Sequence, residues 1–353
     1  MTLARLPRSA RRLLVAAVVL AAIEPLVPGL VHRLETARYE SGPVFRFENS
    51  DLFSLGPVVQ YLREHPTGRR PRVVFFGNSI VWGYFLEPEQ SLPAAFQHLT
   101  PAVQVFNMAI NGFKSGSAYL ITKNIIDAVD TVYLVLDPSD VSTVGRTAHP
   151  MLPQLVRVGT EDLERFALTP PNRVEAQFAD LLGVWSLYRD AYRLQAALFG
   201  TSTRVYVYQH KMSLPSRIWR AVRGPASDHQ GSEPVSPPPA AGVDVNVEVA
   251  SASAPAARRG ELAAAHPFLW DYSELVRTHR KRAVIVQIEG YSVDIGPVDR
   301  ADLNLIFRPY VSFVKVSIPR TLRMADGLHL SAEGARAVAQ ALRRHAPPAA
   351  TGP

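Results

Sequence analysis

The sequence contains no cysteine among its 353 residues. This absence excludes disulfide bonds, zinc sites built from cysteine thiolates and a thiol nucleophile. It does not identify the compartment, because a protein without disulfide bonds can also be exported. The composition, with 47% hydrophobic and 20% charged residues, is typical of a globular protein with a sizeable core. The length suits one large domain or two small ones.

The chain also lacks a concentrated basic segment of the kind that binds nucleic acid. The net charge is +7, but four of the positive charges come from arginines within the first twelve residues. No dense run of lysine and arginine with interleaved aromatic residues follows. Because such runs form the electrostatic footprint of nucleic-acid-binding proteins, we expect no nucleic-acid partner.

The N-terminus carries the most apolar stretch and no clean A-x-A cleavage site. The basic segment 5–12 precedes an apolar stretch, 13–31, whose 19 residues are about enough to cross a bilayer, although Glu24 and Pro25 interrupt it. We therefore predict a single-pass membrane anchor in residues 1–35, with residues 36–353 outside the cytoplasm. A cleaved signal peptide with secretion of the rest, or a buried helix of a soluble protein, remain the alternatives.

Five short apolar runs predict the strands of a buried sheet. They are continuous rather than alternating, as expected where helices cover both faces of a parallel sheet. The runs are 72–77, 103–107, 131–137, 283–289 and 311–317. Helical patterns lie between and after them, at 89–99, 115–128, 268–280 and 331–345. Strands that alternate with helices predict an α/β sandwich with right-handed crossovers.

This alternation breaks within residues 145–267, which we interpret as an insertion. Residues 171–200 have the pattern of a helix or helix pair with an aromatic stripe, and the stripe is typical of packing. Residues 223–261 are rich in Pro, Ala, Ser and Gly and almost free of aromatic residues. Such a segment buries too little apolar surface to offset its ordering entropy, so we predict a disordered loop there.

The stretch "FFGNSIVWG" (75–83) ends the first predicted strand with a polar pair between two glycines. A β-turn is the simpler interpretation, since Gly, Asn and Ser are common turn residues. The other is that Ser79 is a nucleophile at the carboxyl end of a parallel strand, where open α/β sheets bind ligands. The nucleophile elbow of α/β-hydrolases is disfavoured, because it needs glycine where Val81 stands.

A second candidate is "DGLHLS" (326–331), just before the last predicted helix. Asp326 and His329 are three residues apart and can meet in one turn. A carboxylate in this position can hold an imidazole in the tautomer that accepts a proton from a serine hydroxyl. Alternatively, the aspartate caps the helix and the histidine is a satisfied structural residue.

Taken together, these motifs resemble the SGNH (GDSL-like) hydrolase superfamily over about residues 70–145 and 280–345. "GNSIVWG" looks like its first block, with Asn78 in place of aspartate, "FNMAINGFKSGS" resembles the second, and "DGLHLSAEGARAVAQAL" matches the last. The resemblance implies a flavodoxin-like three-layer α/β/α sandwich with a five-stranded parallel sheet. It also implies a Ser79–His329–Asp326 triad and an oxyanion hole formed by the backbone N–H groups of Ser79 and Gly112.

The third block departs from the family pattern. The resemblance calls for Gly-x-Asn-Asp, with the asparagine completing the oxyanion hole, but the sequence here is Asp137-Pro138-Ser139-Asp140. The Ser139 hydroxyl is then the candidate replacement donor. Loss of one oxyanion donor typically lowers the rate by about 10²–10³-fold, so the substitution also fits a site that has lost its chemistry.

From the resemblance we expect a serine-dependent esterase or O-acyltransferase without a metal or cofactor. Its substrate would be an acylated glycan or small acyl ester, with acetyl groups of an extracytoplasmic polysaccharide as the favoured case. A membrane-bound protein that donates the acyl group is an expected partner. The alternative is a non-catalytic carbohydrate-binding or scaffolding subunit of a system that modifies envelope polysaccharides.

Overall fold

The computed structural model describes residues 7–40, 44–46, 55–110, 114–136, 147–171, 190–199, 245–246, 256–292, 295–324 and 326–347. The chain divides into two compact units. Unit 1 comprises residues 1–41 and 171–225, and unit 2 comprises residues 42–170 and 226–353. This division differs in its boundaries from the predicted one, an anchor (1–35) followed by a single domain (36–353), which stays a prediction.

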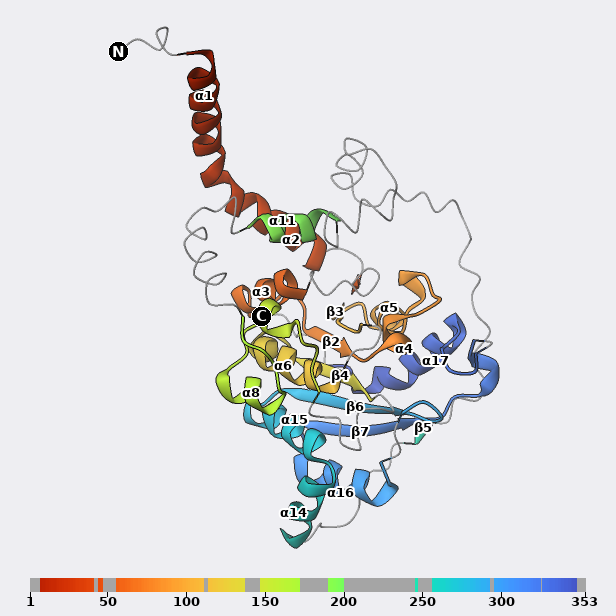
Figure 1. The fold of residues 1–353 in the computed structure, drawn as a ribbon. Helices are drawn as coiled ribbons and strands as arrows, with labels where there is room; N and C mark the ends of the chain where they lie inside the picture. The colour runs from red at the N-terminus through yellow and green to blue at the C-terminus, as the bar shows by residue number, and fades with distance from the viewer. Residues whose placement is uncertain are drawn as a thin grey trace. The chain divides into compact units, whose positions relative to one another are not determined.

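Unit 2 is built around one sheet, for which the described residues supply seven strands (Figure 1). In chain order they are β1 (Phe45–Arg46), β2 (Arg72–Phe76), β3 (Gln104–Asn107), β4 (Thr131–Val135), β5 (Val245–Asn246), β6 (Arg282–Ile288) and β7 (Val311–Val316). Their spatial order is β1-β3-β2-β4-β6-β7-β5. The five predicted strands are confirmed as the parallel centre of the sheet, and the two-residue strands β1 and β5 extend its edges. β5 pairs with β7 in the antiparallel sense.

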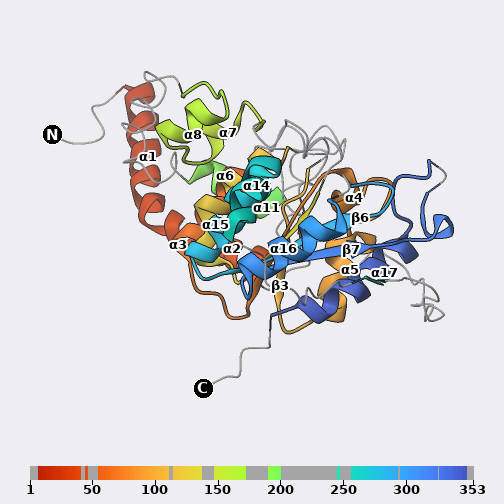
Figure 2. The same cartoon turned by 90° about the horizontal axis from the view of Figure 1, so that it is seen from below.

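Both faces of this sheet are buried, which explains why its strands are continuous apolar runs. Successive residues of a strand point to opposite faces, and Val73 and Phe75 are as fully buried as Val74 and Phe76. Helices α5 (Leu92–Leu99) and α17 (Ala332–Leu342) pack together on the face of Val73 and Phe75 (Figures 1 and 2). Helix α15 (Pro267–Thr278) contacts β6 and β7 and also packs on α6 (Ser115–Ile125).

The predicted helices at 89–99, 115–128, 268–280 and 331–345 are confirmed in unit 2, with short 3-10 turns at some ends. Among the described residues of this unit, the other helices are α3 (Leu55–Glu64), α4 (Ser79–Trp82), α7 (Leu152–Leu155), α8 (Thr160–Arg165), α14 (Ala256–Ala265) and α16 (Pro297–Phe307). The described part of the unit also contains the 3-10 turns η5 (Pro88–Gln90), η6 (Ile126–Ala128), η7 (Arg320–Leu322) and η8 (Arg343–His345).

Unit 1 contains the apolar N-terminal stretch. Helix α1 (Arg8–Ile23), the 3-10 turn η2 (Glu24–Leu26) and helix α2 (Val27–Glu40) follow one another directly, with Pro25 in the turn. The stretch Leu14–Glu40 is long and apolar enough to cross a membrane or to act as a signal sequence. Val18 and Leu26 are 60% and 67% exposed, unlike side chains of a soluble core helix. An apolar N-terminal helix is thus confirmed, and its orientation in a membrane stays a prediction.

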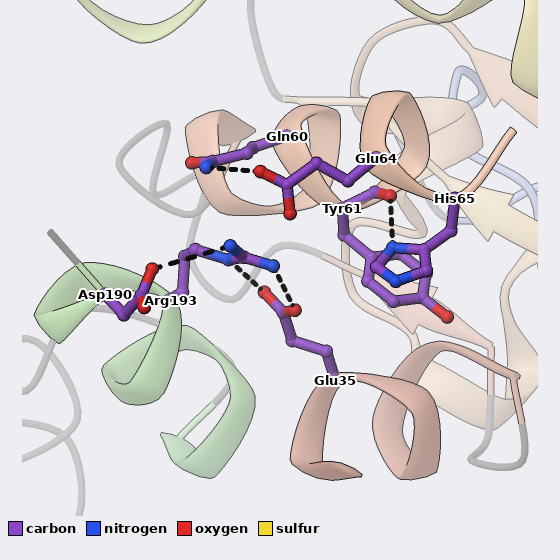
Figure 3. A network of polar contacts seen from close by, with 7 residues as sticks. All are labelled: Glu35, Gln60, Tyr61, Glu64, His65, Asp190 and Arg193. Carbon is purple, nitrogen blue, oxygen red and sulfur yellow. Dashed lines mark hydrogen bonds and ion pairs between the residues drawn. The ribbon is translucent and has the colours of Figure 1, made fainter. Parts of the chain in front are cut away.

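A buried ion pair joins α2 to helix α11 (Ala191–Phe199) within unit 1 (Figure 3). The Arg193 guanidinium donates from Nε to Oε1 of Glu35 at 2.8 Å and from Nη2 to Oε2 at 2.6 Å. Asp190 lies beside the same guanidinium, 3.5 Å from Nη1. In unit 2, α3 carries the i,i+4 contact from Gln60 to Glu64 that the same figure draws.

Most of the predicted insertion loop lies outside the described residues. Of residues 223–261, the structure describes β5 and the first turns of α14, which begins at Ala256 inside the segment for which we predicted a disordered loop. Of the predicted helical segment 171–200, it describes residue 171 and 190–199, and α11 is helical as expected.

Candidate functional site

The first part of the site is the sharp junction between β2 and α4. A Cβ atom on Gly77 would lie 2.5 Å from Cγ2 of Val81, so only glycine lets the helix turn back this closely on the strand. Asn78 caps the helix, and its Oδ1 accepts a hydrogen bond from the Ile80 N–H at 3.4 Å. The junction places Ser79 as the first helical residue beyond the carboxyl end of β2.

The second part is the loop between β7 and α17. Arg323 and Leu330 form an antiparallel bridge, and the Met324 N–H donates to the His329 carbonyl at 2.7 Å. The turn depends on Gly327, whose φ of +68° lies in the left-handed region that glycine favours. Its tip carries Asp326, and the loop returns His329 toward the sheet.

The Asp326 carboxylate organises this loop rather than capping the helix that follows. Its Oδ1 accepts from the N–H groups of Leu328 and His329 at 2.9 and 3.0 Å. The cap of α17 is Ser331, whose hydroxyl accepts from the Gly334 N–H at 3.1 Å. The interpretation of Asp326 as a helix cap is therefore wrong.

Three predicted site residues meet in one hydrogen-bonded chain. His329 Nδ1 lies 2.6 Å from Asp326 Oδ2, and His329 Nε2 lies 2.9 Å from Ser79 Oγ. Asp326 can only accept while it is ionised. With the imidazole hydrogen on Nδ1, His329 donates to Asp326 and its Nε2 accepts from the Ser79 hydroxyl. This is the arrangement in which an imidazole can remove the serine proton.

Hydrogen bonding keeps the Asp326 carboxylate ionised. It lowers the pKa of Asp326 from 3.8 to about 2, first through the His329 side chain and then through the N–H groups of Leu328 and His329. Since the folded-state pKa is depressed, the stabilisation from these bonds is complete above about pH 4 and is lost as the pH falls toward 2. The carboxylate is therefore charged throughout the neutral range.

The loop after β6 forms hydrogen bonds with both parts of the site. The Tyr291 hydroxyl donates to Oδ1 of Asn78, next to Ser79. The Arg323 guanidinium donates to the carbonyl of Glu289 and, at 3.1 Å, to that of Gly327. Neither Tyr291 nor Arg323 was predicted from the sequence. The available signal for Tyr291 was its position just after the carboxyl end of the fourth predicted strand.

Two aromatic rings, also missed, lie against the imidazole. The ring centroids of Tyr84 and Phe85 are 5.3 and 5.5 Å from that of His329. Both residues directly follow Gly83, which ends α4 in a left-handed conformation. No local pattern in the sequence indicated that this segment meets the distant loop of His329.

The other predicted oxyanion donors, Gly112 and Ser139, lie outside the described residues. The chain before Gly112 is described as far as Ile110, whose N–H donates to the Gly77 carbonyl at 3.2 Å. That contact brings the segment leading to Gly112 beside the segment leading to Ser79. The oxyanion roles of Ser79, Gly112 and Ser139 stay predictions.

The close approach at Gly77 leads to a first prediction. Gly77→Ala should destabilise unit 2 by about 1–3 kcal/mol, since overpacking forces nearby atoms to move, and should displace Ser79 from His329. Adding Val81→Ala removes the clashing Cγ2 atom and should restore part of both the melting temperature and the turnover. A single variant with unchanged melting temperature and turnover would contradict this account of the junction.

Neither the protein-family models nor the curated proteins include a match to this chain. Its function must therefore be inferred from its own residues. Among the described residues, the hydrogen-bonded serine, histidine and aspartate at the carboxyl ends of β2 and β7 are the strongest indication of chemistry.

Proposed function

We propose that this chain is a serine-dependent esterase or O-acyltransferase of the SGNH (GDSL-like) type. The observation that carries the proposal is the chain of contacts from Ser79 Oγ through His329 to Asp326, at 2.9 and 2.6 Å. Ser79 and His329 are 250 positions apart, so their contact is a property of the fold rather than of a local turn. A turn-forming serine would need no imidazole at hydrogen-bond distance.

The strand order supports the same proposal. Numbered along the chain, the five central strands have the order 2-1-3-4-5, which is that of flavodoxin-like doubly wound sheets. Such sheets bind ligands beyond the carboxyl ends of their strands, and Ser79, Asp326 and His329 all follow strands there. We therefore propose a three-layer α/β/α sandwich of the SGNH type with residues 145–267 as an insertion.

In the proposed reaction, His329 Nε2 accepts the Ser79 proton while Oγ attacks the ester carbonyl carbon. The tetrahedral intermediate collapses to a serine ester when the bond to the leaving alcohol breaks, and His329 returns the proton to the alcohol oxygen. Water or an acceptor hydroxyl then attacks the serine ester, its proton passes to His329, and Ser79 is regenerated. Asp326 holds His329 in the required tautomer and stabilises the imidazolium.

The proposed substrates are acyl groups, above all acetyl groups, on an extracytoplasmic polysaccharide or other glycan. The apolar N-terminal helix supports a membrane-anchored protein whose catalytic part faces away from the cytoplasm, or a secreted one. In the transferase version of the proposal, a membrane-bound partner supplies the acyl group. The choice of glycan follows from the family resemblance rather than from the site itself.

The second candidate is a non-catalytic carbohydrate-binding or scaffolding subunit. It is favoured by the sequence Asp137-Pro138-Ser139-Asp140, which lacks the asparagine donor expected in the third block. Weak oxyanion stabilisation would leave an assembled triad with little turnover.

Acetyl transfer separates the two candidates. Detergent-solubilised full-length protein should release acetate from an activated acetyl ester, and an acceptor sugar should divert part of the acetyl group if the protein is a transferase. The same protein with Ser79→Ala is the control. Activity that survives this substitution would contradict the mechanism, and a folded, sugar-binding protein without activity would favour the binding subunit.

A further inference from the structure

An exposed apolar patch adjoins the candidate triad. Within the described part of unit 2, the exposed large hydrophobic side chains are Tyr84 (38%), Phe85 (67%), Leu328 (39%) and Val298 (57%). The first three adjoin His329: two through ring contacts and Leu328 as its neighbour in the chain. Such clustering of exposed apolar groups is typical of interaction sites rather than of ordinary surface.

Phe85 adopts a backbone conformation that burial in the core does not explain. Its φ of +66° lies in the left-handed region, which is unfavourable for a bulky side chain. Exposure of two thirds of the residue means that core packing does not compensate for this conformation. Strained residues that persist next to a reactive group point to a functional constraint.

The position of the patch indicates which half of an ester it would meet. His329 must return its proton to the leaving-group oxygen, so the alcohol half of the substrate passes beside Nε2. The rings of Tyr84 and Phe85 lie against this imidazole at 5.3 and 5.5 Å. They are therefore placed to contact the alcohol half rather than the acyl group bonded to Ser79.

We propose that Tyr84, Phe85 and Leu328 form a platform on which a sugar ring carrying the ester stacks. This inference rests on the proposed function and adds a specificity determinant to it. A pyranose presents a face of C–H groups that suits the face of an aromatic ring, and it leaves its hydroxyls in water. A long-chain alcohol would instead need an apolar cavity that buries most of its surface, whereas these three side chains are exposed.

A matched pair of esters tests the platform. Methyl 6-O-acetylglucopyranoside and 6-O-acetylglucitol both release acetate from a primary alcohol, but only the first has a ring. Phe85→Ala and Tyr84→Ala should each lower the ratio of kcat/KM for the cyclic over the acyclic ester by about five- to tenfold, because stacking is lost only for the ring. Val298→Ala, which removes an exposed side chain on α16, should leave both values unchanged.

Two further substitutions of Phe85 test whether the change in ester preference comes from a loss of structure. Phe85→Gly relieves the left-handed strain, so it should keep or raise the melting temperature while losing the preference for the cyclic ester. Phe85→Trp should retain the preference. An unchanged ratio would overturn the platform. If both kcat/KM values fall equally, the rings only position His329, and if neither value falls, the rings do not contact the substrate.

Binding distinguishes failure of the platform from failure of the proposed function. Turnover of neither ester would contradict the proposed function. The platform is then tested by calorimetric titration of Ser79→Ala protein with the methyl glycoside. Phe85→Ala in that background should weaken binding about five- to tenfold, and unchanged binding would overturn the platform independently of catalysis.

Discussion

Ser79→Ala is expected to lower kcat for acyl ester turnover by at least about 10³-fold. The substitution removes the nucleophile and leaves only binding and electrostatic contributions to the rate. His329→Ala should have an effect of similar size, because without an imidazole 2.9 Å from Oγ nothing in this chain of contacts accepts the serine proton. The measurement is steady-state kinetics on an acetyl ester, with melting temperatures as the check on folding.

A double variant tests whether the two residues act together. Because Ser79 and His329 act as a unit, Ser79→Ala combined with His329→Ala should be hardly slower than either single variant. Losses that multiply would mean that the two residues contribute independently. That result would contradict a proton transfer between them.

Asp326→Asn is expected to lower kcat by about 10³–10⁴-fold while leaving the loop folded. The asparagine Oδ1 can still accept from the N–H groups of Leu328 and His329. Its amide, however, donates toward His329 Nδ1, so the imidazole hydrogen moves to Nε2, which then faces Ser79 as a donor. A donor at this position cannot accept the serine proton.

The chain offers a matched control for this substitution. Asp127 Oδ1 lies 3.1 Å from His279 Nδ1 on the surface, so Asp127→Asn alters a similar pair and should leave kcat unchanged. In the unsubstituted protein, hydrogen bonding lowers the pKa of Asp326 to about 2, so protonation of this carboxylate should not contribute to the pH dependence of kcat/KM above about pH 4. A carboxylate titration above that pH that disappears in Asp326→Asn, or full activity of Asp326→Asn, would remove the carboxylate from its proposed role.

The centre of the fold could be predicted from sequence because each central strand is buried on both faces. Short continuous apolar runs such as 72–77 and 283–289 are typical of strands in a sheet that helices cover on both sides. The edge strands β1 and β5 have two residues each, too few to form a pattern. Helix α3 was missed although Leu55, Val58, Val59 and Leu62 recur at helical spacing and are all buried; Pro57 near its start obscured the pattern.

The site was predictable where chemistry-bearing residues follow strand ends. Ser79, Asp326 and His329 could be named because the motifs that contain them resemble, in the same order along the chain, blocks of the SGNH superfamily. Tyr84 and Phe85 could not, since aromatic residues occur throughout the sequence and the contacts of these two with the site depend on a segment that is distant along the chain. These ring contacts are visible only in the folded structure, because no local sequence pattern indicates which distant segments meet.

Covalent labelling tests the central claim most directly. The protein should react with a fluorophosphonate probe, and peptide mass spectrometry should place the adduct on Ser79. Labelling should fall sharply in His329→Ala and Asp326→Asn but persist in Asp127→Asn, because the probe reports an activated serine. Absence of labelling in the folded, unsubstituted protein, or an adduct on another residue, would contradict the claim that Ser79 is an activated nucleophile.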